Sequence, residues 1–78
     1  MDILGKLQDI FRDIFDDDSL VLTKETSSDD VEGWDSLAQL NVIVASEADF
    51  GIKFDINDIA KIKNVGDIVD IVERKLQS

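Results

Sequence analysis

Neither cysteine nor histidine occurs among the 78 residues of this chain, and proline is absent as well. Without cysteine no disulfide can form, and the common zinc ligands are missing. The usual acid–base and thiol groups of catalysis are missing too, and four glycines form no glycine-rich phosphate loop. Carboxylates are abundant, but a solvated acidic surface explains most of them. The composition therefore indicates a protein that is not an enzyme and that has no dedicated metal site.

Positive charge is scarce, because 8 basic residues stand against 18 acidic ones and give a net charge of −10. Residues 1–35 hold 11 acids and 3 bases, a net charge of −8. This balance argues against nucleic acid, since phosphate contacts need lysine and arginine. It also argues against an anionic membrane surface. It favours partners with basic surfaces, attracted over long distances by a force that salt weakens.

Long hydrophobic runs are also missing, so no segment approaches the length of a membrane span. The N-terminal residues lack the basic start and apolar run of a signal peptide. We expect a cytoplasmic monomer without stable membrane insertion. Residues 1–78 are expected to form a single domain, whose 44% apolar residues suffice for one core.

The first apolar segment, residues 3–15, keeps helical spacing for three turns. Asp2 is suited to cap its N-terminus. Three aspartates at 16–18 are unfavourable at a helix C-terminus, so the helix should end there. Phe11 and Phe15 are expected to be buried.

A second helix is expected from Ser36 to Phe50, ended by Gly51 in a left-handed conformation. The predicted apolar stripe of this helix consists of Leu37, Leu40, Ile43, Val44 and Phe50. The opposite face of a helical wheel, expected to be exposed, carries Ala38, Asn41, Ala45 and Ala48. Phe50 should be buried in the core.

Two further helix starts follow. Asp55, with Asp58 three residues on, forms a variant of the capping box and opens a short helix. Asn64 and Asp67 repeat this pattern before a last helix over residues 65–76. A core position on that helix is expected at Ile68. Three long helices and one short one predict an all-α fold.

The connection over residues 19–35 is long for a compact domain, and such loops are usually functional or carry local structure. Val31 and Trp34 are expected to anchor it to the core. A partner contact is the alternative for Trp34. The acidic runs at 16–18 and 29–30 do not fit an EF-hand pattern, although weak divalent binding there stays open.

The most informative segment is Gly33-Trp34-Asp35-Ser36-Leu37, where the long connection meets a helix start. A phosphodiester on Ser36 would lie at a helix N-terminus, where free N–H groups and the helix dipole stabilise an anion. The simpler alternative is that Asp35 or Ser36 only caps the helix. These residues alone favour the simpler alternative.

The wider pattern reverses that preference. Asp35-Ser36-Leu37, followed by residues 47–52 and 64–68, resembles the acyl carrier protein family over nearly the whole chain. The resemblance implies an antiparallel four-helix bundle with a short third helix and a long first loop. It implies that a phosphopantetheinyl transferase attaches 4′-phosphopantetheine to Ser36, between Asp35 and Leu37. Acyl groups would then be held as thioesters, sheltered in the bundle and presented to biosynthetic enzymes of fatty acid or related lipid and polyketide synthesis.

Departures from the family pattern bear on the choice of partner. Ala38 and Asn41 stand where members serving fatty acid synthesis usually have acids, and Glu47 is retained. These three positions are the expected contacts with acyl-loading and acyl-processing enzymes. Ser46 stands where the family usually buries a large apolar residue. The departures favour a specialised polyketide, hydroxyacyl or surface-glycan pathway over general fatty acid synthesis. An unmodified helical interaction domain remains the alternative function.

Overall fold

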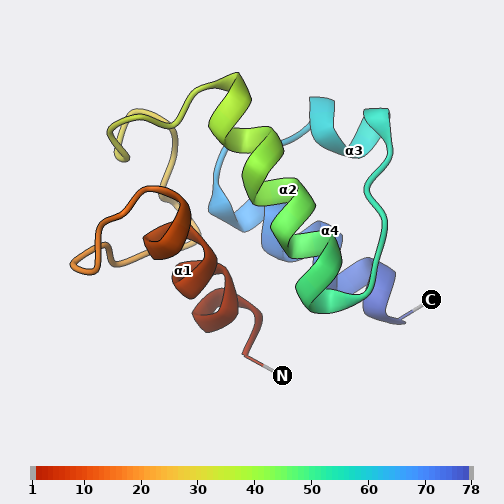
Figure 1. The fold of residues 1–78 in the computed structure, drawn as a ribbon. Helices are drawn as coiled ribbons and strands as arrows, with labels where there is room; N and C mark the ends of the chain where they lie inside the picture. The colour runs from red at the N-terminus through yellow and green to blue at the C-terminus, as the bar shows by residue number, and fades with distance from the viewer. Residues whose placement is uncertain (1, 78) are drawn as a thin grey trace.

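The computed structural model describes residues 2–77. Four helices follow one another along this part of the chain: α1 (Ile3–Ile14), α2 (Ser36–Phe50), α3 (Ile56–Ala60) and α4 (Val65–Gln77). Helix α1 runs antiparallel to α2, α4 lies behind α2, and the short α3 lies beside the start of α2 (Figure 1). Helix α1 packs against both α2 and α4. The predicted all-α, antiparallel four-helix bundle with a long first loop is confirmed.

The predicted helix ends are confirmed because the capping groups are local. Asp2 caps α1 by accepting a hydrogen bond from a backbone N–H of the first turn. Gly51 ends α2 with φ at 67°, a left-handed conformation that glycine adopts without a Cβ clash. Helix α1 stops just before the run of aspartates at 16–18, as the charge pattern predicted.

The two later helix starts share one arrangement. Asp55 and Asp58 form a reciprocal capping box, each side chain accepting from the other residue's backbone N–H. Asn64 and Asp67 exchange the same pair of hydrogen bonds at the start of α4. Both predicted caps are therefore present.

A single cluster of buried apolar side chains joins the helices and the first loop. The predicted core positions Phe11, Phe50 and Ile68 are buried, and so are the two predicted loop anchors, Val31 and Trp34. The buried side chains of the cluster are Leu7, Ile10, Phe11, Leu22, Val31, Trp34, Val42, Ile43, Phe50, Ile52, Ile62, Val65, Ile68, Val69, Ile71 and Val72. Phe15 is only half-buried, because it lies at the end of α1, at the edge of this cluster.

The predicted inner face of α2 is wrong. Ile43 and Phe50 are buried as expected, but the other three stripe residues, Leu37, Leu40 and Val44, are exposed. Val42 and Ser46 are buried in their place. Asn41 and Ala48 are exposed as expected, whereas Ala38 and Ala45 are half-buried. Helix α2 carries apolar residues on both sides, so spacing alone did not determine which side faces the core.

Ser46 occupies its buried position without an unpaired polar atom. Its hydroxyl donates a 2.7 Å hydrogen bond to the carbonyl of Val42, one turn earlier in α2. This internal hydrogen bond offsets the cost of burying a hydroxyl group. A serine is therefore compatible with the core at the point where α2 meets its neighbours.

The first loop also completes the start of α4. The backbone carbonyl of Thr26 accepts a 2.8 Å hydrogen bond from Val65, and that of Lys24 accepts a 2.8 Å hydrogen bond from Gly66. The first four N–H groups of a helix have no partner within the helix, and the loop supplies a partner for two of them. These contacts fix the loop that leads into α2.

Asp58 ties α3 to the end of α4. Its buried carboxylate lies 2.6 Å from the guanidinium of Arg74 and 3.0 Å from the ammonium of Lys75. Hydrogen bonding by Lys75, together with the backbone N–H of Asp55 and with Arg74, lowers the pKa of Asp58 from 3.8 to about 2. The ionised form is therefore the one that stabilises the fold.

Replacing this carboxylate is expected to give a pH-dependent loss of stability. Because the folded pKa lies below the unfolded one, the contribution is present above about pH 4 and is lost as the pH falls through about 2. Asp58→Asn should lower Tm near neutral pH. The difference in Tm between this variant and wild type should disappear as the pH falls from about 4 to about 2. Asp70→Asn, an exposed change on α4, is the control with the same charge difference. A difference in Tm between Asp58→Asn and wild type that stays constant with pH would contradict the conclusion that the ionised carboxylate stabilises the fold.

Candidate functional site

The start of α2 is shaped by the residues just before it. Gly33 has φ at 88°, a region that L-residues with side chains rarely adopt. The turn it makes brings Trp34 into the core and sets Asp35 in an extended conformation. Asp35 then caps the helix, because its Oδ1 accepts a 2.8 Å hydrogen bond from the N–H of Ala38. The capping role expected of Asp35 is confirmed.

Ser36 is the first residue of α2 and is exposed. Its hydroxyl forms no hydrogen bond with any other residue in the described range, 2–77. An oxygen at this point lies where the helix dipole and first-turn N–H groups favour negative charge. Since Asp35 already caps the helix, Ser36 is not needed for that purpose. Its neighbour Leu37 is also exposed.

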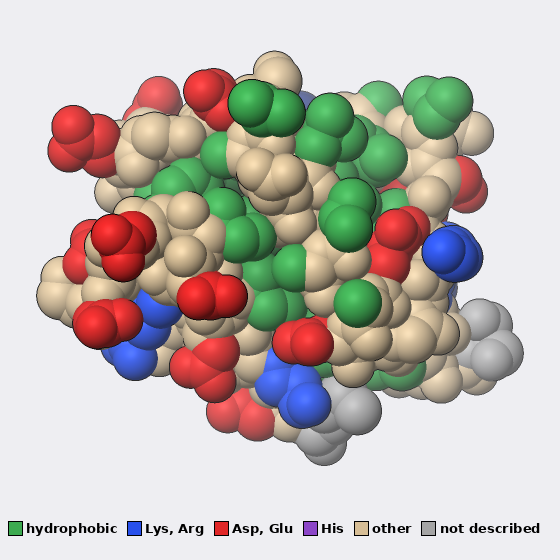
Figure 2. Space-filling model, viewed as in Figure 1, with side chains coloured by type: hydrophobic (Ala, Val, Ile, Leu, Met, Phe, Trp, Pro, Cys, Tyr) green, Lys and Arg blue, Asp and Glu red, His purple; other side chains and the backbone are tan. Residues whose placement is uncertain are grey.

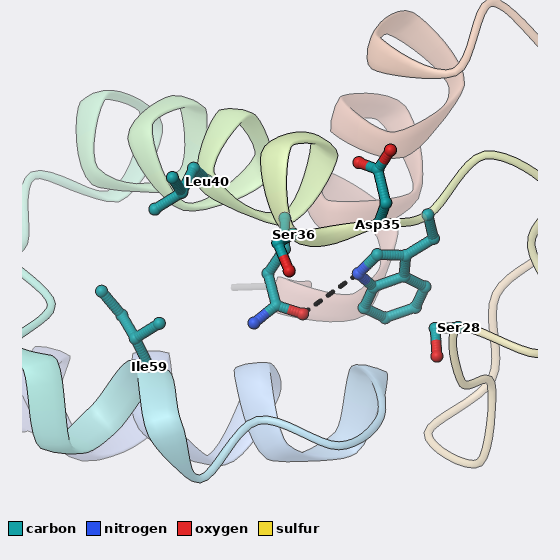
Figure 3. Close-up of a pocket in the computed structure, with 7 residues that line it drawn as sticks. Ser28, Asp35, Ser36, Leu40 and Ile59 are labelled. Carbon is teal, nitrogen blue, oxygen red and sulfur yellow. Dashed lines mark hydrogen bonds between the residues drawn. The ribbon is translucent and has the colours of Figure 1, made fainter.

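A pocket of about 430 Å³ opens beside Ser36. It is lined by Ser28, Trp34, Asp35, Ser36, Gln39, Leu40 and Ile59. Leu40 from α2 and Ile59 from α3 extend toward each other, whereas Ser28 and Asp35 lie at the loop end (Figure 3). The pocket therefore has a polar end near the loop and an apolar end between the two helices.

Trp34 joins this pocket to the core. Its ring packs edge-on against Phe11 of α1, with centroids 5.1 Å apart, and the side chain is buried. Its Nε1 donates a 3.1 Å hydrogen bond to Oε1 of Gln39, the contact drawn in Figure 3. Trp34 is thus the predicted core anchor, and it also forms one wall of the pocket. Its burial leaves little of it for a partner to contact.

The three residues expected to contact partners differ in their surroundings. Asn41 is exposed on α2, and Ala38 is half-buried. Glu47 is half-buried, and its Oε2 accepts a 2.8 Å hydrogen bond from the N–H of Phe54. That hydrogen bond links the end of α2 to the segment leading into α3, so this carboxylate already has a partner within the fold.

Comparison with known proteins identifies the family. The family model described as the phosphopantetheine attachment site matches residues 5–72. The acyl carrier protein of Thermotoga maritima is 36% identical over 75 residues, which cover 96% of this chain and 93% of that protein. The chain belongs to the acyl carrier protein family.

A solved structure of the family has the same fold. The solution NMR structure of a holo acyl carrier protein from Geobacter metallireducens superposes with a TM-score of 0.91 at 51% identity. The match covers 99% of this chain and 88% of that chain. This protein is accordingly a carrier and not an enzyme, with covalent 4′-phosphopantetheine as its cofactor. It interacts with acyl-processing enzymes and with a transferase that adds the arm.

No helix within residues 2–77 is long and apolar enough to cross a membrane. No group of three or more acidic side chains in the same range is placed to hold a metal ion.

Three pocket residues were missed by the sequence analysis: Ser28, Gln39 and Ile59. Ser28 lies eight residues before Ser36 and Ile59 lies 23 residues after it, and both come together with Ser36 only through folding. Gln39 lies one turn after Ser36 on the same helix, and that spacing was the one available indication of its place.

Proposed function

We propose that Ser36 carries the 4′-phosphopantetheine arm, flanked by Asp35 and Leu37, and that residues 1–78 act as one carrier domain. The observation that carries the proposal is the hydroxyl of Ser36, which lies at the junction of the long loop with α2. It is exposed and forms no hydrogen bond with another described residue. The phosphodiester formed there would be stabilised by the helix N-terminus. Asp35 supports this by capping the helix independently of Ser36.

The pocket beside Ser36 fits the chemistry of such an arm. When bound, the arm supplies a terminal thiol that holds an acyl group as a thioester. Ser28 and Gln39 offer hydrogen-bonding groups for its amides at the polar end of the pocket. Leu40 and Ile59 offer apolar surface for its alkyl segments or for the start of an acyl chain.

We further propose that the carrier acts as a cytoplasmic monomer in a specialised pathway. The net charge of −10 favours partners with basic surfaces and opposes association between copies. At the expected contact positions, however, Ala38 and Asn41 are uncharged. The Glu47 carboxylate already accepts a hydrogen bond from the backbone N–H of Phe54. An enzyme of general fatty acid synthesis whose basic residues pair with free carboxylates at these positions would lose those ion pairs.

Mapping the modification tests the proposed site. The full chain is incubated with coenzyme A and a broad-specificity phosphopantetheinyl transferase until no further change occurs. Intact mass should show one added arm, and proteolysis should place it on the peptide that contains Ser36. Modification on another peptide would reject Ser36, and a chain that stays unmodified would favour the unmodified interaction domain.

A further inference from the structure

Helix α3 buries a charged side chain in place of an apolar one. It comprises five residues, too few for a helix to be stable without tertiary contacts. The one side chain that it buries is that of Asp58, whereas Ile56 is 84% exposed. Figure 2 shows hydrophobic side chains on the surface over α2 and toward α3. Burial of apolar side chains therefore does little to hold α3 on the rest of the protein.

The contacts of Asp58 reach the last turn of α4. One carboxylate oxygen lies 2.6 Å from the guanidinium of Arg74, and the other lies 3.0 Å from the ammonium of Lys75. The second oxygen also accepts a 3.2 Å hydrogen bond from the N–H of Asp55, the residue that caps α3. The Asp58 side chain is only 6% exposed, so salt screens these interactions little. Asp58 thus joins the start of α3 to the end of α4.

The chain on either side of α3 is held by other contacts. Ile52 before the helix and Ile62 after it are buried in the core. The N–H of Phe54 donates to the carboxylate of Glu47 on α2. Helix α3 itself makes few contacts with the other helices, unlike α1. Loss of the Asp58 ion pairs would therefore release α3 between two fixed ends and leave the core in place.

Ile59 connects this arrangement to the pocket beside Ser36. It directly follows Asp58 in α3, is half-buried and packs against the edge of the core. Its side chain forms the wall of the pocket opposite Leu40 of α2 (Figure 3). Because the two residues are adjacent in one short helix, the position of Asp58 fixes that of Ile59. An arm that lies between Ile59 and Leu40 is held only while this wall stays in place.

We propose that Asp58 is a positioning residue for the arm: through Arg74 and Lys75 it holds Ile59 as a wall of the pocket and so shelters the thioester. The proposal rests on Ser36 as the attachment residue and on the pocket as the place of the arm. A small nucleophile reaches the thioester only while the arm is outside the pocket. The rate of cleavage therefore follows the fraction of molecules in which the wall has moved.

Cleavage of an acylated arm by hydroxylamine measures this shelter. A broad-specificity phosphopantetheinyl transferase and hexanoyl coenzyme A load the full chain with the acylated arm in one step. The nitrogen of hydroxylamine then attacks the thioester carbonyl, which forms the hydroxamic acid and releases the thiol of the arm. Intact mass follows the loss of the hexanoyl group. The loaded wild type should react more slowly than hexanoyl coenzyme A, whose thioester is free in solution.

Asp58→Asn should raise the cleavage rate of the loaded chain by about fivefold or more. An asparagine keeps an oxygen for the N–H of Asp55 but lacks the charge that attracts Arg74 and Lys75. Asp70→Asn, which removes the same charge from an exposed position on α4, should leave the rate at the wild-type value. All rates are measured well below the Tm of each variant.

Ile59→Ala separates a positioning role from a general loss of stability. Removing the wall should raise the cleavage rate as Asp58→Asn does, and combining the two changes should raise it no further. If Asp58 only stabilised the whole fold, its replacement would raise the rate by the same factor with and without Ile59. That result would overturn the proposal, and so would a wild-type rate for Asp58→Asn.

The loading step distinguishes this proposal from the function on which it rests. A wild-type chain that receives no arm on Ser36 rejects the attachment site, and the role of Asp58 with it. A loaded wild type that reacts as fast as hexanoyl coenzyme A rejects the pocket as a shelter. If wild type and Asp58→Asn are loaded alike, and both react equally slowly, only the role of Asp58 is rejected.

Discussion

Ser36→Ala is expected to abolish addition of the arm completely, whereas Ser28→Ala should be modified to completion. Both serines are exposed and both line the same pocket, so they form a matched pair. The phosphodiester needs a hydroxyl oxygen, and only the one at the first position of α2 lies at a helix N-terminus. Intact mass after incubation with coenzyme A and the transferase measures both outcomes.

Folding of the Ser36 variant is the necessary control. The Ser36 hydroxyl forms no hydrogen bond with any described residue, and Asp35 caps α2. The Tm of Ser36→Ala should therefore match that of wild type. An arm found on Ser36→Ala, or missing from Ser28→Ala, would show that the attachment residue is wrongly assigned.

Phe11→Ala is expected to cause the largest loss of stability. The Phe11 side chain is fully buried, with its ring 5.1 Å from that of Trp34 and 5.5 Å from that of Phe15. Removing a buried aromatic side chain costs about 3–5 kcal/mol. That is a large share of the roughly 5–15 kcal/mol of a typical domain, and this chain is short. Chemical denaturation followed by circular dichroism gives the free energy of unfolding.

Two further measurements locate the effect. Trp34 is the only tryptophan of the chain, so loss of its packing partner should shift its fluorescence emission toward the red. Phe15→Ala is the matched control. Because this ring is half-buried at the edge of the core, its removal should lower the free energy of unfolding clearly less. If Phe15→Ala proves the more destabilising change, the core is not centred on Phe11 as described.

The sequence by itself determined the helices and their ends. Caps act within about four residues, so Asp2, Asp35 and Gly51 could be recognised without knowledge of the fold. The short third helix was predicted in the same way from Asp55 and Asp58. The residues adjacent to Ser36 favoured a simple helix cap, and only the resemblance of the wider pattern to a family indicated Ser36 as the attachment residue.

Only the tertiary structure decided which side of α2 is buried and what gathers around Ser36. Helix α2 is apolar on both sides, and packing against its neighbours turned Val42 inward and Val44 outward. The pocket joins Ser36 to Ile59, which lies on another helix. These features depend on contacts between segments far apart in the chain, which no local pattern of residues records.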